Sequence, residues 1–190
     1  MSDSPTKDLH GGIVQEPTPV LRQKAREVTK KEFDSKELRA ILKKMSNALH
    51  TQPDGVAIAA PQIGVSLRIF LVRGYIMAGQ VDLPREERDD TIPDAVFINP
   101  VITKLSRKKE ALSEGCLSVR GIWGTVHRSV QTRVRAYDEH GAQFEYGGSG
   151  LLAQAFQHET DHLDGVLFID KADEVHKHVP KKKTHNESES

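Results

Sequence analysis

The segment QAFQHETDHLDG, residues 154–165, constrains the fold more than any other part of this chain. It contains His158, Glu159 and His162 in the order H-E-x-x-H, and Phe156 belongs to the apolar turn before them. Residues four apart on an α-helix share one face, so the two imidazoles can approach a single ion. Charge beside an apolar helix face is costly unless it is paired or binds a metal. The segment therefore predicts a buried helix with a metal site, and Glu159 is placed as a general base.

This metal-binding helix is expected to begin near Ser149, a candidate N-cap, and to end at Gly165. With nine histidines in the chain, a chance H-E-x-x-H arises in roughly a few per cent of such sequences, so an ordinary helix with two histidines is the alternative. Catalytic sites of the zinc type use three protein ligands and leave a position for water. The only cysteine, Cys116, is the candidate third ligand, although an isolated cysteine can also be a small buried hydrophobe.

A second, amphipathic helix is predicted nearer the N-terminus. Apolar residues recur at helical spacing over residues 38–49, and Asp34 followed by Glu37 is typical of a helix start. Pro53 and Gly55 mark its end. Each large apolar side chain that it buries contributes on the order of 1.5 to 3 kcal/mol, which is enough to hold the helix on a sheet.

Four strands are predicted between the two helices, and alternation of apolar residues is clearest in the third. They cover residues 67–72, 95–103, 130–137 and 142–146. The polar residues 74–93, which carry REERDD, are expected to form a hydrated surface loop without a core. The predicted fold class is α+β, with mostly antiparallel sheets packed around a central metal-binding helix and an N-terminal amphipathic helix.

One catalytic domain is expected over residues 13–173, with disordered polar tails at 1–12 and 174–190. The chain has 27 basic and 27 acidic residues, so no broad attraction to nucleic acid or membranes is expected, and the partner should be a small molecule or a peptide. A single cysteine, with no signal peptide or membrane-length apolar run, favours the cytoplasm, with an organelle as the weaker alternative.

Three motifs, in the same order, resemble the signatures of the peptide deformylases. They are GVAIAAPQ (Gly55–Gln62), EGCLS (Glu114–Ser118) and QHETDH (Gln157–His162), within a likeness that runs from about Ile13 to Ile169. The resemblance implies a metal-dependent hydrolase that removes the formyl group from the initiator methionine of nascent polypeptides and releases formate. The expected partners are therefore N-formylmethionyl peptides and nascent chains.

The resemblance also implies roles for individual residues. The metal ligands would be Cys116, His158 and His162. The catalytic groups would be Glu159 as proton shuttle, with Gln62 and the backbone N–H of Leu117 on the carbonyl oxygen. The substrate-binding residues would be Gly55, Val56, Ala57, Gly115, Leu151, Gln154 and Ala155. Family members commonly use ferrous iron, so Fe²⁺ is expected in the cell, with Zn²⁺, Ni²⁺ or Co²⁺ as alternatives.

Two positions depart from the usual family pattern. Ala57 stands where a second glycine is usual, and because a positive φ would cost roughly 1–2 kcal/mol there, a negative φ is expected. Gln154 lies one turn before His158, where relatives tend to place an apolar residue, so it is expected to put a polar wall in the methionine pocket. Glu114 and Arg128 match a family acid–base pair that braces the cysteine loop.

Two other functions fit parts of the pattern. A zincin-like peptidase would need a third ligand after the helix, from Asp170, Asp173 or Glu174, and it would leave Cys116 unexplained. A non-catalytic module that binds N-termini would hold a structural metal, but structural sites are normally closed by four protein ligands. Separately, the basic run at residues 181–183 raises the hypothesis of ribosome association, without direct recognition of nucleic acid.

Overall fold

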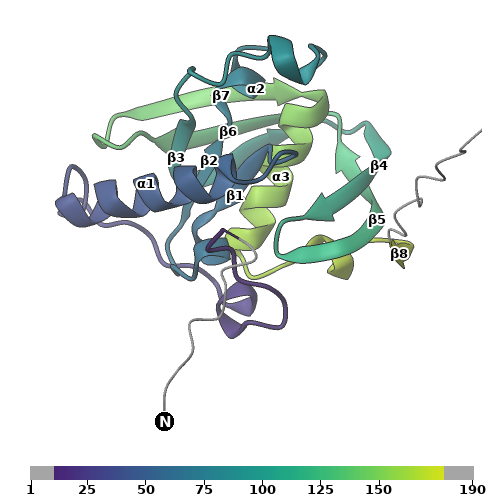
Figure 1. Ribbon diagram of the computed structural model, residues 1–190, viewed down its shortest axis with the longest axis horizontal. Helices are drawn as coiled ribbons and strands as arrows, with labels where there is room; N and C mark the ends of the chain where they lie inside the picture. The colour runs from purple at the N-terminus through teal and green to yellow at the C-terminus, as the bar shows by residue number, and fades with distance from the viewer. Residues whose placement is uncertain (1–10, 178–190) are drawn as a thin grey trace, which may run out of the picture.

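The computed structural model describes residues 11–177, which form two antiparallel sheets on either side of one long helix (Figure 1). The larger sheet has the strand order β1-β2-β3-β6-β7 and the smaller has β4-β5-β8. The larger sheet contains β1 (Ala57–Ala59), β2 (Ile69–Val72), β3 (Ala95–Leu105), β6 (Gln131–Tyr137) and β7 (Gln143–Ser149). The smaller contains β4 (Lys109–Cys116), β5 (Val119–Ser129) and β8 (Val175–Lys177). The predicted α+β class with antiparallel sheets is confirmed.

Helices cover both faces of the larger sheet at β1 and β2, whose residues are buried on both sides. Alternate residues point to opposite faces, so Ile69 and Leu71 of β2 pack with α1 (Lys36–His50), while Phe70 and Val72 pack towards α3 (Gly150–Leu163). The rings of Phe70 and Phe97 stack with centroids 4.6 Å apart, and Phe156 of α3 lies 5.2 Å from Phe97. In Figure 1, α3 stands between the two sheets.

The two long helices lie where the apolar spacing predicts them, with one correction at the start of α1. Its N-cap is Ser35, whose Oγ accepts the N–H of Leu38 at 3.0 Å. Asp34, predicted as the start, has φ of 57° and lies one residue too early. For α3, Ser149 is the N-cap, but its side chain makes no capping bond. Gly165 follows the helix with φ of 75°, as expected of a glycine that ends one.

The prediction of a coreless loop at residues 74–93 is wrong for its first part. The short helix α2 (Gly74–Met77) is buried there, and a Cβ on Gly74 would collide with the backbone of Ile92. Two guanidinium groups lie against the ring of Tyr75, with Arg73 Cζ 5.3 Å and Arg88 Cζ 4.9 Å from its centroid. The REERDD run does remain at the surface, and it includes a short 3₁₀ turn (Arg85–Glu87).

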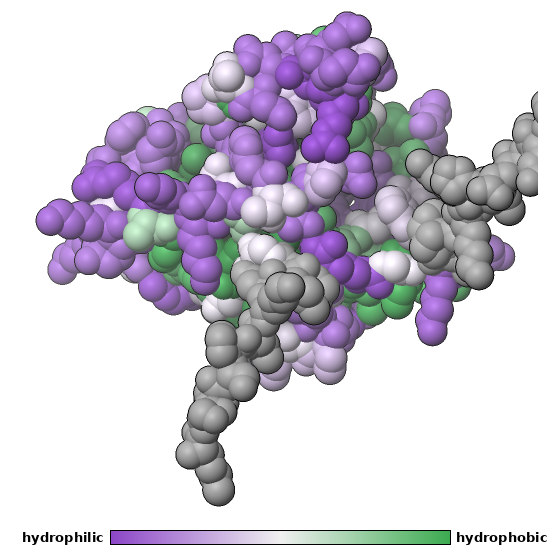
Figure 2. All heavy atoms as spheres, viewed as in Figure 1, coloured by the Kyte–Doolittle hydropathy of each residue, from purple (hydrophilic) through white to green (hydrophobic). Residues whose placement is uncertain are grey.

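Strands β1, β4, β5 and β8 were not among the predicted elements. β8 corrects the expectation of a disordered tail for residues 175–177, because these residues pair with β5 and join the domain. Residues 1–10 and 178–190, including the basic run at 181–183, lie outside the described residues. Within residues 11–177, no helix is long and apolar enough to cross a membrane. On the face drawn in Figure 2, hydrophilic residues predominate and hydrophobic ones show mainly between them.

Candidate metal centre

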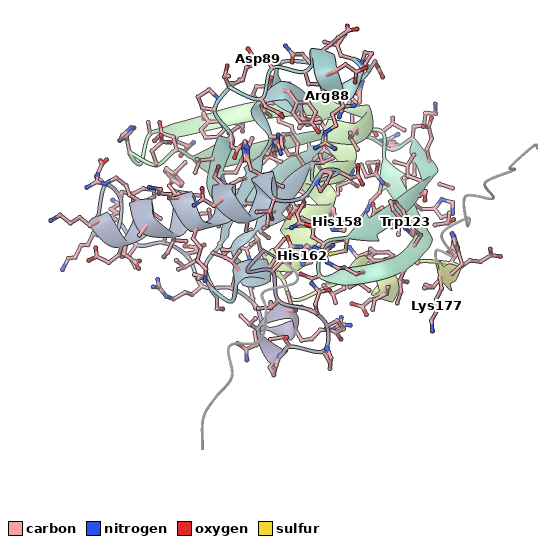
Figure 3. The ribbon with its side chains drawn as sticks, viewed as in Figure 1. Arg88, Asp89, Trp123, His158, His162 and Lys177 are labelled. Carbon is pink, nitrogen blue, oxygen red and sulfur yellow. The ribbon has the colours of Figure 1, made fainter. Side chains whose placement is uncertain are left out.

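Three potential metal ligands meet where the C-terminal end of β4 approaches α3. The ligand atoms of Cys116, His158 and His162 all lie within 4.8 Å of one another, and Cys116 Sγ is 3.2 Å from His162 Nε2. Figure 3 shows both histidines on α3, and their ring centroids are 5.0 Å apart. Within the part of the chain that the structure describes, this is the one cluster of three His, Cys, Asp or Glu ligands suited to an ion.

A register shift brings the cysteine to this point. β4 pairs regularly with β5 up to Gly115, and the pairing shifts between Gly115 and Cys116. Two donors then approach the sulfur: the backbone N–H of Ser118 at 3.4 Å and Gln62 Nε2 at 3.6 Å. Both groups present an N–H to the sulfur, and the thiolate is the form of cysteine that binds a metal.

A buried ion pair orients the first histidine. Glu114 Oε2 lies 3.1 Å from His158 Nδ1, and with Nδ1 as the donor, Nε2 is left for an ion. Arg128 donates to both oxygens of Glu114, at 2.8 and 2.9 Å, and to Asp161 Oδ2 at 2.6 Å. Burial raises the pKa of Glu114, but the hydrogen bonds from His158 and Arg128 outweigh burial and hold the pKa at about 2. Glu114 is therefore ionised, and together with Arg128 it forms a brace that connects His158 and Asp161 of α3 to the smaller sheet.

The carboxyl group of Glu159 is buried beside these ligands. Its side chain is 4% exposed, and its Oε2 has no hydrogen-bond partner among the described residues. Burial raises the pKa of Glu159 to about 7, helped by the charges of Glu114 and Asp161 and opposed by His158. A carboxyl that titrates near neutral pH can both accept and return a proton. Burial also lowers the pKa of His162, which favours the neutral imidazole that a metal ligand requires.

Gln62 lies on the 3₁₀ turn Ala60–Ile63 that follows β1, and it is 1% exposed. Its Oε1 accepts the N–H of Ala59 at 2.8 Å, which turns Nε2 towards Ser118 Oγ at 3.3 Å and the cysteine sulfur. The carbonyl of Leu117 accepts a bond from Gln15 at 3.0 Å. The glutamine of the first motif is thus buried, and both ends of its amide are hydrogen-bonded.

The expected substrate-binding residues come from three elements that meet beside the ligands. Ala57 and Ala155 are buried in one apolar cluster, against which Val56 and Leu151 pack. Ala57 is in the extended β1 strand and is not among the residues with positive φ, so its expected negative φ is confirmed. Gly55 lies just before β1, and Gly115 lies on β4.

Gln154 is held by the smaller sheet. Its Nε2 donates to the carbonyl of Ser113 at 3.0 Å and to Glu114 Oε1 at 3.3 Å. The amide is therefore tied to β4, and its bond to Glu114 connects it to the brace on His158. The sequence pointed to Gln154 but not to these hydrogen-bond partners. It gave no sign of the role of Asp161, which lies inside the H-E-x-x-H motif and is the second carboxylate that accepts from Arg128.

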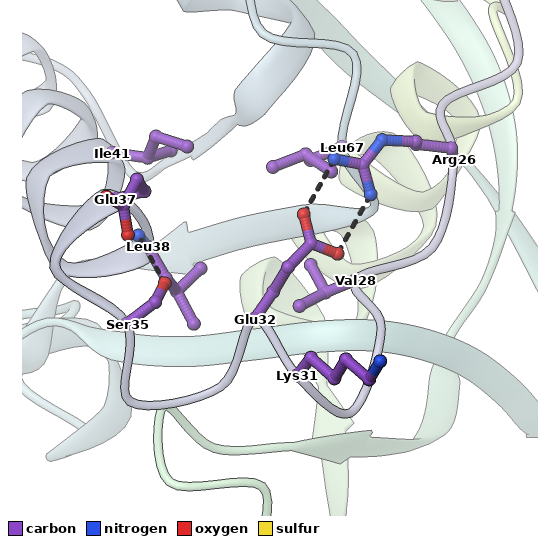
Figure 4. Close-up of a pocket in the computed structure, with 9 residues that line it drawn as sticks. All are labelled: Arg26, Val28, Lys31, Glu32, Ser35, Glu37, Leu38, Ile41 and Leu67. Atoms are coloured by element: carbon purple, nitrogen blue, oxygen red, sulfur yellow. Dashed lines mark hydrogen bonds and ion pairs between the residues drawn. The ribbon is translucent and has the colours of Figure 1, made fainter.

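Two of the three carboxylates that a zincin-like site could use form ion pairs elsewhere. Asp170 pairs with Arg22 at 2.5 Å, and Asp173 pairs with His127 at 3.0 Å. A separate cavity of about 310 Å³ lies between the segment before α1 and the start of that helix (Figure 4). None of its lining residues belongs to the three motifs; they are Arg26, Val28, Lys31, Glu32, Ser35, Glu37, Leu38, Ile41 and Leu67.

The family model for polypeptide deformylases matches residues 11–178, which includes every residue of this centre. The chain belongs to the polypeptide deformylase family. It is 41% identical over 165 residues to the peptide deformylase of Desulforudis audaxviator, covering 87% of this chain and 95% of that protein. It is also 41% identical over 164 residues to the chloroplastic/mitochondrial peptide deformylase 1A of Arabidopsis thaliana, covering 84% of this chain and 60% of the plant protein.

Solved structures of the family share this deformylase fold. The crystal structure of a peptide deformylase from Synechococcus elongatus in complex with actinonin has a TM-score of 0.71 and 32% identity, over 90% of this chain and 83% of that one. A Plasmodium falciparum peptide deformylase has a TM-score of 0.71 and 35% identity, over 84% of this chain and 85% of that one. This deformylase is therefore a hydrolase, and the resemblance first seen in three short motifs extends over the whole described fold.

Proposed function

We propose that this chain hydrolyses the formamide of N-formylmethionyl peptides and nascent chains with one divalent metal ion held by Cys116, His158 and His162. The observation that carries the proposal is the meeting of these three donors, within 4.8 Å, beside the unpaired buried carboxyl of Glu159. One thiolate and two imidazoles suit Fe²⁺, Zn²⁺, Ni²⁺ and Co²⁺, and we propose Fe²⁺ in the cell. Three protein ligands also leave room for water, as in catalytic rather than structural sites.

The divalent ion, when bound, supplies Lewis-acid polarisation of a water molecule and of the formyl carbonyl. Glu159 takes the proton from the attacking water and delivers it to the methionine nitrogen as the C–N bond breaks, so that formate and a free N-terminus are released. Its pKa of about 7 matches both tasks at neutral pH. General acid–base catalysis of this kind typically contributes roughly 10² to 10⁴ in rate.

Gln62 and the backbone N–H of Leu117 are proposed to donate to the carbonyl oxygen as negative charge develops there. The amide of Gln62 is fixed before substrate binds, because Oε1 is already held by Ala59 N–H. Preorganised donors stabilise charge without reorganising during the reaction. Losing one such donor commonly costs about 2.7 to 4 kcal/mol of transition-state stabilisation.

The peptide is proposed to bind as an added strand, since both sheets offer an edge strand next to the ligands. β1 is at one edge of the larger sheet and β4 is at one edge of the smaller. Residues Gly55, Val56 and Ala57 would contact the peptide backbone from one side, and Gly115 from the other. The methionine side chain would enter the apolar surface formed with Leu151 and Ala155, with Gln154 as its polar neighbour.

Release of formate from formyl-Met peptides tests the proposal directly. The purified protein, loaded anaerobically with Fe²⁺, Ni²⁺ or Zn²⁺ in parallel, should release formate and leave internal amides intact; anaerobic handling protects Cys116 from oxidation. Glu159→Gln should keep its metal but lose most turnover, whereas Cys116→Ala should lose metal. Cleavage of internal bonds without formate would instead favour the zincin-like alternative. Full activity of metal-loaded Glu159→Gln would refute the proton-shuttle role.

We place this activity in a catalytic domain over residues 13–173, completed by β8. We propose the cytoplasm as its location, with an organelle as the alternative; the Arabidopsis relative is named as chloroplastic/mitochondrial. Ribosome association through residues 181–183 is a separate hypothesis, tested by removing residues 178–190 and comparing co-sedimentation with ribosomes.

A further inference from the structure

Trp123, the only tryptophan in the chain, is 42% exposed next to the metal centre. It lies on β5 opposite Gly115 of β4, the residue that precedes the ligand Cys116. Ring atoms Cε3 and Cζ3 would be 3.1 Å from a Cβ placed on Gly115. The indole therefore lies over Gly115, which is on the edge strand β4. Figure 3 shows Trp123 on the smaller sheet and His158 on the neighbouring α3.

The backbone of Gly115 points to that same edge. Thr125 of β5 uses its N–H for Glu174 and its carbonyl for Asp173, both on the β8 side. Ser113, which is opposite Thr125, has its carbonyl bonded by Gln154 of α3. Ser113 and Thr125 are thus a non-hydrogen-bonded pair. Because hydrogen-bonded and non-hydrogen-bonded pairs alternate along antiparallel strands, Gly115 and Trp123, two residues further on, are also a non-hydrogen-bonded pair. The N–H and carbonyl of Gly115 are consequently directed away from β5 and towards an incoming strand.

The pleat of the sheet decides which substrate side chain meets the indole. A residue paired with Gly115 projects its side chain on the same face as the Gly115 Cβ direction, where the Trp123 ring lies. The other face of this sheet is turned inward: a Cβ on Gly124 would touch Phe168, and Glu114 reaches His158 on α3. A methionine at the metal centre projects inward, towards α3. The next residue of the peptide, by alternation, projects outward to the indole.

We propose that Trp123 is a specificity-determining residue for the substrate position that follows methionine, and that it favours an aromatic or large apolar side chain there. This inference rests on the proposed deformylase function. An aromatic pair contributes beyond the burial of its area, and Gly115, having no side chain, leaves the ring face open towards the substrate. The expected preference for phenylalanine over alanine is about threefold to tenfold in kcat/KM.

Metal-loaded enzyme and the peptides formyl-Met-Phe-Ser and formyl-Met-Ala-Ser test the proposal. The wild type should favour the phenylalanine peptide, and Trp123→Ala should bring the ratio of the two kcat/KM values close to one. Trp123→Phe should keep the preference, which separates loss of the ring from damage to the fold. The matched control is Tyr146→Ala, an aromatic residue 38% exposed on β7, and it should leave the ratio unchanged.

A binding measurement provides a second readout. Trp123 is the only tryptophan, so any change in tryptophan fluorescence comes from this residue. The reaction product Met-Phe-Ser should change the fluorescence of Trp123 at lower concentration than Met-Ala-Ser. If formate is released but Trp123→Ala has the wild-type ratio, the inference is wrong and the proposed function stands. If the wild type releases no formate from either peptide, the proposed function fails, and the inference fails with it.

Discussion

Glu114→Gln tests the buried brace behind the metal centre, because it removes one charge with little change in shape. Glu114 and Arg128 have side chains only 2% and 4% exposed, and Glu114 accepts from Arg128, Gln154 and His158. A glutamine at this position must turn its NH₂ group towards one of these donors. At least one hydrogen bond becomes a clash between donors, and Arg128 keeps Asp161 as its remaining carboxylate.

Two magnitudes follow from this geometry. Removing one partner of a buried ion pair destabilises a protein by about 3–5 kcal/mol, and because Asp161 remains, we expect about 3 kcal/mol here. A domain of this size has roughly 5–15 kcal/mol of total stability, so the loss is large but leaves a folded protein. The partner of His158 Nδ1 also orients a ligand, and changing such partners typically costs 10- to 100-fold in metal affinity.

Urea unfolding at pH 7 with a chelator gives the stability, and competition with a chelator gives the affinity for Zn²⁺. The matched control is Glu145→Gln, whose partner Arg133 lies 3.9 Å away with both side chains about half exposed. A surface pair of this kind contributes about 0–1 kcal/mol, and it lies on β6 and β7 of the larger sheet, whereas Glu114 is in the smaller one. If Glu114→Gln changed stability by less than about 1 kcal/mol and bound Zn²⁺ as tightly as Glu145→Gln did, the brace would be refuted.

Two further predictions concern stability. The pKa of Glu159 is raised from 4.5 to about 7, so the folded state holds an extra proton between these pH values and the wild type loses stability as pH rises through them, by about 3 kcal/mol. Chelator-treated Glu159→Gln should show no such loss in urea unfolding from pH 4.5 to 8, and parallel curves for both proteins would contradict the burial argument. Removing the N-cap in Ser35→Ala should cost about 1 kcal/mol, and Asp34→Asn, which tolerates the same positive φ, should cost less. If Asp34→Asn lost more stability than Ser35→Ala, Asp34 rather than Ser35 would be the N-cap.

Strands with a local apolar pattern could be predicted from the sequence, and strands without one could not. β2, β3, β6 and β7 lie close to their predicted positions because each has enough apolar or alternating residues to be recognised alone. β4 and β5 contain Gly115, Gly121 and Gly124, and they bury Glu114 and Arg128. In the strand register Glu114 lies opposite Gly124 and Arg128 lies opposite Glu110, so the burial of the Glu114–Arg128 pair follows from side-chain contacts that no local pattern shows.

The metal centre, like the fold, could be predicted from the sequence only in part. Residue types and spacing were sufficient to name His158, Glu159, His162 and the candidate Cys116, and the resemblance to the deformylases added the role of Gln62. The register shift that turns the sulfur towards α3 could not be predicted, since it depends on pairing between β4 and β5. The same applies to the amide of Gln154, which sequence reasoning assigned to the methionine pocket and which the structure ties to Ser113.

The sequence by itself determined the two long helices, the chemistry of the ligand set and the family, since helical periodicity and short motifs are local properties of the chain. Only the tertiary structure decided that the Glu114–Arg128 pair, which the family resemblance implied, is almost fully buried, that β8 completes the smaller sheet, and that Trp123 covers Gly115 at an open edge. Each of these depends on hydrogen-bond register between distant segments. A shift of one residue would turn every side chain of a strand to the opposite face, so only the assembled sheets specify which side chains meet.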